Sequence, residues 1–371
     1  MDVHARTATC HLCVAETGET ASRTFGNCPS ASDIAEWISE FPKPAYAAYE
    51  SGCTAFGLCR GLRGLGIDCD VIAVTTLAKS GKQRIQKCDK LDARAILSAM
   101  MNPMSEHTCV WCPDVEAEGA RDLARAADEA VQSLKRSKQK MLALLLRHGF
   151  VWNEKTPTGR PKAKWTKAFW AWVDSIELPD ECSRTALSMC RAAVDANAGL
   201  VAAAKREVAA AAERPRWKPY VDAMTALKGI EVPGAFLAAA EFGDFTRFKS
   251  GRRVSCWLGT VPRNGSSAER EKHGAITKAG NSRLRRTLVE GSANMAARTT
   301  GKKLLPAGRI VPPEVKAIAD KANARLVKRY RHLTADNGMR SCKARVAVVS
   351  EQARWIWAIG LAVQAGQEAC A

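Results

Sequence analysis

The stretch AYAAYESGCTAFGLCRGLRGLGIDCDVIAV, residues 45–74, decides the fold class of the first part of the chain. Ala45–Tyr49 and Cys69–Val74 are short apolar runs of the length that is typical of buried strands. Between them, Leu58–Leu65 has the apolar spacing of a helix, which ends at Gly66. A strand, a helix and a second strand in this order predict two parallel strands with the helix packed on their sheet.

The flanking segments extend the same alternation. Thr7–Ala15 has the composition of a strand, and Ser30–Phe41 is an amphipathic helix whose first serines are suited to capping it. Lys90–Met101 is a further helix, and Pro103 lies just beyond its end. We therefore expect residues 1–115 to form an α/β domain with a mixed or parallel sheet.

Helical segments dominate the rest of the chain. Val115–His148 and Ser183–Ala212 are long segments rich in alanine and charged residues. The segment Trp152–Lys167 between them contains five lysines or arginines, so residues 116–215 are expected to form a helical hairpin or coiled-coil arm with a basic insertion. Residues 216–300 are predicted to form a compact, mostly helical domain, and residues 301–371 a basic helical C-terminal region. The predicted fold class is α/β plus α.

Charge is unevenly distributed over the 371 residues, whose net charge is +18. Residues 1–115 carry 11 basic and 13 acidic side chains, whereas residues 116–371 carry 45 and 25. Because lysine and arginine release counterions when they bind phosphate backbones, the cationic part predicts a nucleic-acid partner. The sequence shows neither a long apolar span nor a signal peptide, so a cytoplasmic protein without a membrane partner is expected.

The 14 cysteines are scattered along the chain without an export signal, so reduced thiols are expected. The pairs Cys10–Cys13 and Cys109–Cys112 have the CxxC spacing of zinc ligands, with His11 and His107 close in sequence. Both pairs also fall in short β-like segments, where cysteine acts as a small apolar residue. We favour the strand interpretation.

Four acidic residues of the first domain are candidates for a divalent-metal site, namely Asp2, Glu50, Asp89 and Asp92. Asp89 and Asp92 are three residues apart, which places them on one helix face with Cβ atoms about 5–6 Å apart. Like charges at that spacing favour a bound cation, and Mg²⁺ or Mn²⁺ prefers such oxygen ligands. Two ions could stabilise the attacking and leaving oxygens of a phosphodiester exchange. The alternative is that Asp89 only charges a helix N-terminus, where acids are favoured.

Two glycine-containing segments of the cationic part are further candidates. Leu227–Ile230, followed by an alanine-rich helix, resembles a helix–hairpin–helix turn that could present backbone N–H groups to a phosphate. Gly259–Ala268 is a loop of small polar residues among arginines. Its serines could act as nucleophiles, but serine needs a base or an activated electrophile, and His273 has no evident role. From the residues alone, contacts with phosphate or within the loop are the favoured interpretation.

Basic and aromatic residues suggest how a nucleic acid would be held. The tryptophans of the arm could stack on unpaired bases or pack between the long helices, and packing is favoured for Trp170 and Trp172 over Trp152 and Trp165. Six residues of the cationic domain are candidates for phosphate contacts, although a solvated basic face is an equal alternative for each: Arg252, Arg253, Lys278, Arg283, Arg285 and Arg286.

Several of these stretches together resemble one protein family. GDFTRF (Gly243–Phe248) and ITKAGNSRLRR (Ile276–Arg286) are similar to the C-terminal domain of transposases of the "one-ten" insertion-sequence family. DVHAR (Asp2–Arg6), YESG (Tyr49–Gly52) and KCDKLDARAIL (Lys87–Leu97) are similar to that family's N-terminal domain. The resemblance covers nearly the whole chain, including the helical arm.

The resemblance implies an RNase H-like (RuvC-like) N-terminal domain in which Asp2, Glu50, Asp89 and Asp92 bind divalent metal. It also implies a serine nucleophile five residues after the proline of a GLxP motif, here Pro262, which gives Ser267. That serine would attack a DNA phosphate and form a covalent phosphoserine, which another strand later exchanges. Members of this bacterial family assemble as homodimers and homotetramers, and a structured bridge RNA guides them to donor and target DNA.

Three positions depart from the family pattern. Only Met1 precedes Asp2, whereas several apolar residues are usual there, so we expect either that the chain starts late or that the first strand is truncated and the metal site weakened. Ala268 stands where a glycine is usual, which leaves Ser266 open as the nucleophile, and GLxP is here GTVP. Two other functions stay open: a RuvC-like junction nuclease that hydrolyses DNA with water, and an inactive nucleic-acid-binding remnant.

Overall fold

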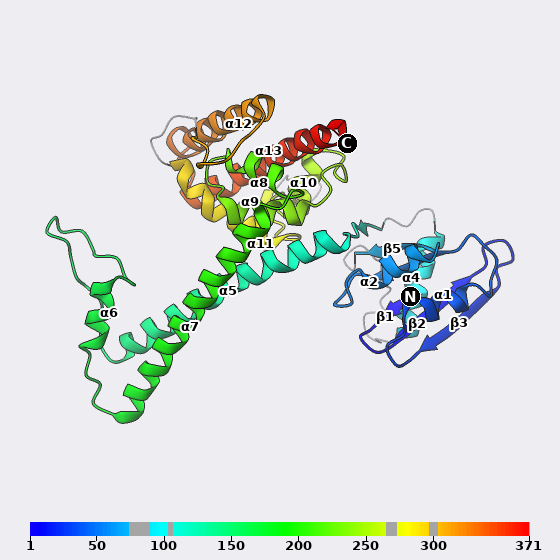
Figure 1. Ribbon diagram of the computed structural model, residues 1–371, viewed down its shortest axis with the longest axis horizontal. Helices are drawn as coiled ribbons and strands as arrows, with labels where there is room; N and C mark the ends of the chain where they lie inside the picture. Colours follow the sequence, from blue (N-terminus) through cyan, green and yellow to red (C-terminus); the bar gives the residue numbers. More distant parts are fainter. Residues whose placement is uncertain (74–88, 103–106, 265–272, 297–302, 371) are drawn as a thin grey trace. The chain divides into compact units, whose positions relative to one another are not determined.

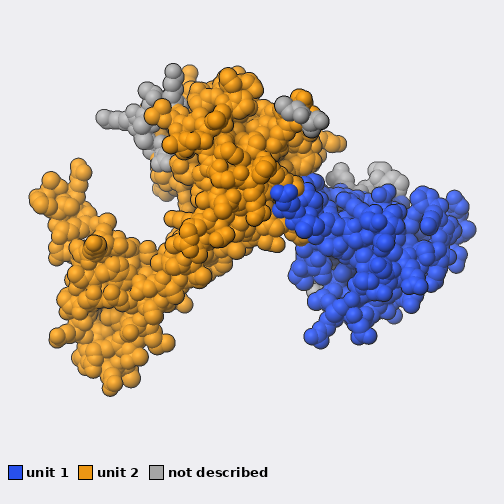
Figure 2. Space-filling view, viewed as in Figure 1, with its two compact units in different colours: residues 1–116 blue, residues 117–371 orange. Residues whose placement is uncertain are grey.

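The computed structural model describes residues 1–73, 89–102, 107–264, 273–296 and 303–370. The chain divides into two compact units, Met1–Glu116 and Ala117–Ala371. Figure 2 shows them in blue and orange, and each is described by itself below. The first unit is α/β and the second is mostly helical, as the sequence predicts.

The described part of unit 1 contains six short strands in two sheets (Figure 1). Strands β1 to β3 are antiparallel, β4 and β5 are parallel, and β6 is antiparallel to β5, so the sheets are mixed. The bounds are β1 Asp2–Val3, β2 Ala8–Cys13, β3 Thr20–Phe25, β4 Tyr46–Glu50, β5 Asp68–Ile72 and β6 Cys109–Val110. Cys10 and Cys13 lie in β2 and Cys109 begins β6, which confirms that both CxxC pairs fall at strands.

The two sheets meet at β1 and β4. The N-terminal amine of Met1 donates a hydrogen bond of 2.6 Å to the carbonyl oxygen of Ala48 in β4, and the two strands pack side by side. The strands of unit 1 therefore follow one another in the order β3-β2-β1-β4-β5-β6.

Three described helices cover this sheet: α1 (Ala31–Ile38), α2 (Gly57–Gly64) and α4 (Asp89–Met101). Ser30 and Asp33 form a capping box at the start of α1, as its first serines suggest. Tyr49 of β4 packs in a core with α1 and α2, whereas the preceding residue, Ala48, packs with Ile96 of α4. Since successive side chains of a strand point to opposite faces, α1 and α2 cover one face and α4 covers the other.

Unit 2 begins with an antiparallel arm formed by α5 (Val115–Arg147) and α7 (Glu181–Ala212), with α6 (Lys167–Asp174) at its tip (Figure 1). The bounds of the two long helices match the prediction closely. Phe169 of α6 is fully buried against Met141 and Val194, which belong to the two long helices. The four tryptophans of the arm tip surround Phe169 and are partly buried, so the packing interpretation is confirmed for Trp170 and Trp172 and extends to Trp152 and Trp165.

The remaining helices of unit 2 form one core: α8 (Lys218–Thr225), α9 (Val232–Phe242), α10 (Gly251–Leu258), α11 (Ser282–Gly291), α12 (Pro313–Arg331) and α13 (Ser341–Cys370). A two-stranded hairpin, β7 (Pro262–Asn264) and β8 (His273–Ile276), follows α10. Helix α13 packs against α8, α10 and α12, so the region predicted from residue 301 shares a core with the preceding domain. Among the described residues, only α13 is long and apolar enough to cross a membrane, and half of its apolar window is buried in this core.

Candidate active site

The GDFTRF motif is part of the hydrophobic core of unit 2. Gly243 ends α9 with φ +63°, and the Asp244 side chain accepts a 2.9 Å hydrogen bond from the backbone N–H of Thr246. The fully buried ring of Phe245 stacks on Tyr220 and on Phe242, with centroid distances of 5.3 and 5.0 Å. The motif therefore fixes the end of α9 and fills the core beside it.

Three arginines surround Glu241, which is only 3% exposed, near the end of α9. Arg125 of α5 donates two hydrogen bonds, of 2.8 and 3.0 Å, to its carboxylate. Arg121 of α5 and Arg247 of the GDFTRF motif donate to the Glu241 carbonyl oxygen over 3.1 and 3.2 Å. Burial lowers the pKa of the Arg247 guanidinium to about 10. This cluster joins the arm to the helical core. The local sequence of α5 does not predict these contacts.

The predicted turn between α8 and α9 exists, but its backbone is held from within the unit. The side-chain oxygen of Asn323 on α12 accepts a 2.8 Å hydrogen bond from the backbone N–H of Lys228. Gln352 on α13 donates to the Lys228 carbonyl oxygen over 2.9 Å. The Lys303 ammonium donates to the carbonyl oxygen of Ile230 over 2.7 Å. The N–H group of Lys228 is therefore used by the fold and is not available to a phosphate.

The glycine of that turn serves close packing. Gly229 has φ +77°, and a Cβ atom there would lie 2.3 Å from the carbonyl oxygen of Gly291 at the end of α11. A Cβ atom on Gly291 would likewise lie 2.1 Å from the Gly229 oxygen. Only two glycines allow this contact between the α8–α9 turn and α11.

The predicted serine loop joins the two strands of the β7–β8 hairpin, whose base is fixed by backbone contacts. Thr277 N–H donates to the Val261 oxygen over 2.9 Å, and Asn281 N–H donates to the Trp257 oxygen over 3.0 Å. A Cβ atom on Gly280 would lie 2.0 Å from that same Trp257 oxygen. Ser266, Ser267 and Ala268 fall between Asn264 and His273, outside the described residues.

The six predicted phosphate-binding residues fall into two groups. The first group consists of arginines on α11 that have partners within the unit: Arg285 donates to the Leu258 oxygen over 2.7 Å, and Arg283 and Arg286 form ion pairs with Asp128 of α5. These contacts tie α11 to the hairpin base and to the arm. The exposed group consists of Arg252 and Arg253 at the start of α10 and Lys278 after β8.

Sequence reasoning did not single out the basic residue that lies next to this exposed group. Arg354 of α13 packs its side chain 3.2 Å from the Cβ position of Gly251, and its Nε donates to Ser255 over 2.9 Å. Arg354 is exposed, so it extends the positive surface at the start of α10. Arg252, Arg253 and Arg354 can bind phosphate groups from two different helices.

The predicted metal ligands of unit 1 come from elements that pack together. Asp2 lies in β1 with 13% of its side chain exposed, and its carboxylate lies 3.3 Å from Nε2 of His4. Glu50 is the last residue of β4, the strand beside β1, and Asp92 lies in α4, which packs on both strands. Asp89 is the first residue of α4, and its side chain is outside the described part.

These carboxylates have the chemistry of a magnesium site, but their described geometry is not that of assembled ligands. Asp2, Glu50 and Asp92 supply only oxygen atoms, which suits Mg²⁺ or Mn²⁺. Among the side chains that the structure describes, which leave out Asp89, no three histidines, cysteines or carboxylates come together around one point. Asp2, Glu50 and Asp92 therefore match a hard divalent cation only in the type of their donor atoms.

Comparison with known proteins identifies the family. Residues 222–305 match the family model described as Transposase IS116/IS110/IS902 family, a span that runs from α8 past α11. The chain is 32% identical over 357 residues to the putative transposase y4qE of Sinorhizobium fredii (strain NBRC 101917 / NGR234), which covers 94% of this chain and 85% of that protein. It is 26% identical over 291 residues to the transposase for insertion sequence element IS1533 of Leptospira borgpetersenii, covering 78% and 82% of the two chains. The chain therefore belongs to the IS110 family of insertion-sequence transposases.

Proposed function

We propose that this transposase cleaves and exchanges DNA strands by metal-dependent phosphoryl transfer, with Ser267 as the nucleophile and unit 1 as an RNase H-like catalytic domain. The observation that carries the proposal is the position of Asp2 and Glu50 on the adjacent strands β1 and β4. The strand order, with three antiparallel strands followed by β4 and its parallel neighbour β5, supports an RNase H-like sheet.

In this proposal Asp2, Glu50, Asp89 and Asp92 hold Mg²⁺ or Mn²⁺. The bound ions would supply Lewis-acid stabilisation of charge on the phosphate oxygens during transfer. The protein's part is to fix the ligands: Asp2 and Glu50 belong to neighbouring strands, and Asp92 belongs to a helix that packs on both of them. Ligands on such elements are held more precisely than ligands on loops.

The Ser267 oxygen would form a bond to the DNA phosphorus, while the bond from phosphorus to one sugar oxygen breaks. The serine proton leaves with the released sugar hydroxyl overall, and a phosphoserine remains. A hydroxyl of another strand then displaces the serine by the reverse exchange. Because each step conserves the number of phosphodiester-type bonds, no external energy source is needed. The exposed residues Arg252 and Arg253 would hold the strand through its phosphates.

The guide and assembly also belong to the proposal. A structured bridge RNA would pair with donor and target DNA, and the protein would act as a homodimer or homotetramer. The arm tip supports an RNA contact, because its half-buried tryptophans belong to the same segment as exposed basic residues such as Lys155 and Arg160. Lys138 and Arg191 already lie over the rings of Trp165 and Trp170, which leaves a cationic aromatic surface.

The test is covalent trapping of the full chain on labelled DNA in the presence of guide RNA and Mg²⁺. We expect a denaturation-resistant protein–DNA adduct for the unchanged chain and for Ser266→Ala, and none for Ser267→Ala or Asp92→Asn. All variants should still bind DNA. Strand cleavage without an adduct in Ser267→Ala would instead indicate a nuclease that uses water. DNA binding with neither adduct nor cleavage in the unchanged chain would indicate an inactive remnant.

A further inference from the structure

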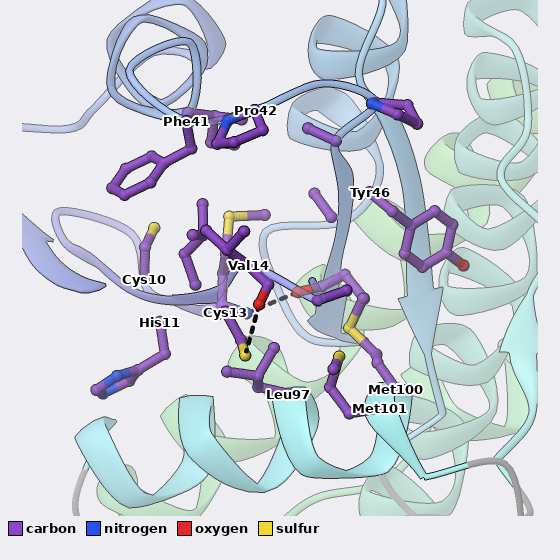
Figure 3. A pocket seen from close by; sticks show the side chains of 18 of the residues that line it. Cys10, His11, Cys13, Val14, Phe41, Pro42, Tyr46, Leu97, Met100 and Met101 are labelled. Carbon is purple, nitrogen blue, oxygen red and sulfur yellow. Dashed lines mark hydrogen bonds between the residues drawn. The ribbon is translucent and has the colours of Figure 1, made fainter. Parts of the chain in front are cut away.

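Two described surfaces of the molecule differ in the charge that they offer to a nucleic acid. A cavity of about 530 Å³ opens in unit 1 beside β2, β4 and the end of α4 (Figure 3). Apolar side chains such as Phe41, Leu97 and Met100 form most of its lining, which holds one lysine and one glutamate. A lining of this kind gives a polyanion almost no charge to bind. The tip of the arm in unit 2 is the opposite case, because exposed cations are concentrated there on a short segment.

Residues 154–162, between α5 and α6, form a hairpin that projects from the arm tip (Figure 1). Lys162 N–H donates to the Glu154 oxygen over 2.8 Å, which joins the two ends of the hairpin. Thr156 N–H donates to the Arg160 oxygen over the same distance, which closes the turn. The backbone of the hairpin is therefore fixed by its own hydrogen bonds, although all but one of its side chains are exposed.

The aromatic core of the arm tip holds the base of this hairpin. The indole N–H of Trp152 donates a 3.1 Å hydrogen bond to the Lys162 carbonyl oxygen. The same indole packs against Phe169 and Trp172, with centroid distances of 5.5 and 5.4 Å. Since Phe169 is fully buried between the long helices, the hairpin is attached to the most rigid part of the tip.

The tryptophans of the tip already have partners for their rings. Trp165 and Trp170 lie 5.7 Å apart, and both contact Phe169. The Lys138 ammonium lies 4.8 Å from the Trp165 ring centroid, and the Arg191 guanidinium lies 5.0 Å from that of Trp170. Stacking on an unpaired base needs a free ring face, whereas binding to the phosphates of a duplex needs only exposed cations. The tip is therefore suited to a double strand.

Most cations of the tip have no acidic partner. The segment from Trp152 to Lys167 contains five basic residues and a single acidic one, Glu154. Only Lys162 lies near that carboxylate, at 3.4 Å. The other four are exposed and form no ion pair with any residue that the structure describes: Lys155, Arg160, Lys164 and Lys167. Such unpaired cations bind phosphate backbones with release of counterions.

The tip lies far along the arm from the helical core, which carries the surface proposed to hold DNA. Helix α5 contacts the core through Asp128 and continues for 19 residues to Arg147. At about 1.5 Å per residue this is roughly 28 Å. A second nucleic-acid segment is therefore the natural partner of the tip, and the proposed function supplies one in the structured guide RNA.

The turn of the hairpin carries a hydroxyl group that suits RNA. The exposed Thr158 hydroxyl lies 2.9 Å from the hydroxyl of Thr156, which also accepts from the backbone N–H of Arg160 over 3.1 Å. An RNA duplex displays its 2′-hydroxyls across a wide and shallow minor groove, which a projecting turn can reach. A DNA duplex has no 2′-hydroxyl to bond to Thr158.

We infer that the hairpin 154–162, together with Lys164 and Lys167 beside it, is a binding site for double-stranded RNA. Its unpaired cations bind phosphates, and the Thr158 hydroxyl bonds to a 2′-hydroxyl in the minor groove. That this RNA is a stem of the guide rests on the proposed function. The contact itself needs no cleavage chemistry, so it is measured by binding alone.

Binding of the full chain to an RNA duplex of about 16 base pairs tests the inference. Lys155→Glu combined with Arg160→Glu should weaken binding on the order of tenfold and reduce the slope of log K against log salt by about 2. The matched control combines Lys321→Glu with Lys328→Glu, which reverses two exposed lysines of α12, and should change neither value. Equal losses in the two double variants would show that only total charge matters and would overturn the inference.

A DNA duplex and a single-stranded RNA of the same length identify the kind of nucleic acid. Thr158→Val should weaken binding to the RNA duplex about threefold and leave binding to the DNA duplex unchanged. An unchanged affinity for the RNA duplex, or the same loss on both duplexes, would overturn the assignment to RNA. A larger loss on the single strand than on the RNA duplex in the Lys155→Glu, Arg160→Glu variant would overturn the assignment to a double strand.

The outcome is separable from that of the proposed chemistry. If the RNA measurements come out as expected while the unchanged chain forms no covalent DNA adduct, the hairpin site stands and the proposed strand exchange fails. If the adduct forms but the variants at Lys155 and Arg160 bind the RNA duplex as well as the unchanged chain does, the hairpin site is wrong and the chemistry stands.

Discussion

The contact between Phe245 and Gly360 gives a test of whether the GDFTRF motif acts through the fold. Phe245 is fully buried and stacks on two aromatic rings. A Cβ atom on Gly360 of α13 would lie 2.2 Å from the Phe245 ring, so the glycine makes room for the phenylalanine. Phe245→Ala and Gly360→Ala should therefore compensate each other when they are combined.

The expected magnitudes follow from the packing. Phe245→Ala removes a fully buried ring and should lower the free energy of unfolding by about 3–5 kcal/mol. Gly360→Ala forces a methyl group into an occupied position and should cost about 1–3 kcal/mol. In the double variant the methyl group added at position 360 enters the space left by the ring. On the Phe245→Ala background, Gly360→Ala should therefore leave the free energy of unfolding unchanged or raise it. The coupling free energy should then be at least about 1 kcal/mol.

Urea denaturation followed by tryptophan fluorescence measures all four proteins. Trp357 donates a 2.8 Å hydrogen bond to the Phe245 carbonyl oxygen, so its emission reports on this core. Phe245→Leu keeps an apolar side chain without the ring and should lie between the unchanged chain and Phe245→Ala. Additive costs in the double variant would refute the contact. Loss of DNA cleavage in Phe245→Ala at unchanged stability would refute the structural role of the motif.

Three more expectations can be measured on single variants. Arg252→Ala should weaken DNA binding and reduce the slope of log K against log salt by about 1, as measured by anisotropy titrations, without changing the Tm. Arg285→Ala should instead lower the free energy of unfolding by about 1 kcal/mol, as measured by thermal unfolding. In Gly229→Ala the added Cβ atom would contact the backbone at the end of α11, whereas Gly308, with a similar φ of +78°, has open space around it. In urea denaturation, Gly229→Ala should therefore lower the free energy of unfolding more than Gly308→Ala does. Burial raises the pKa of Cys10 from 9.0 to about 11, so between these pH values the folded state keeps a proton that the unfolded state loses. The free energy of unfolding should therefore fall as the pH rises through this interval, and it should fall less in Cys10→Ala.

Local patterns were sufficient to predict most elements of the fold. The capping serine of α1, the apolar runs of β4 and β5 and the two long arm helices are all set by neighbouring residues, and the structure confirms them. Strand β3, with the sequence TASRTF, was not predicted, because four of its six residues are exposed and its sequence lacks an apolar run. Antiparallel backbone pairing with β2 defines this strand. The β7–β8 hairpin was missed for a related reason, since glycine contacts at its base fix it to α10.

The candidate site was predictable only in part, because sequence distance conceals partners. Asp2 and Glu50 are 48 residues apart in the sequence, and the fold brings their strands together by placing β1 beside β4. The α11 arginines illustrate the same point for charged residues. Their density predicts a phosphate surface, but Arg283 and Arg286 meet Asp128, which lies more than 150 residues away on α5.

That pairing has a consequence for how this transposase holds DNA. An arginine that already donates to a carboxylate must break that ion pair before it can bind a phosphate fully, whereas Arg252 has no such pair among the described residues. Exposure also separates the two, because only a third of the Arg286 side chain is exposed. An arginine that is paired with a carboxylate between the arm and the core does not at the same time neutralise a DNA phosphate and release its counterion. The residues that bind DNA are therefore better identified by the absence of an internal partner than by the density of positive charge in the sequence.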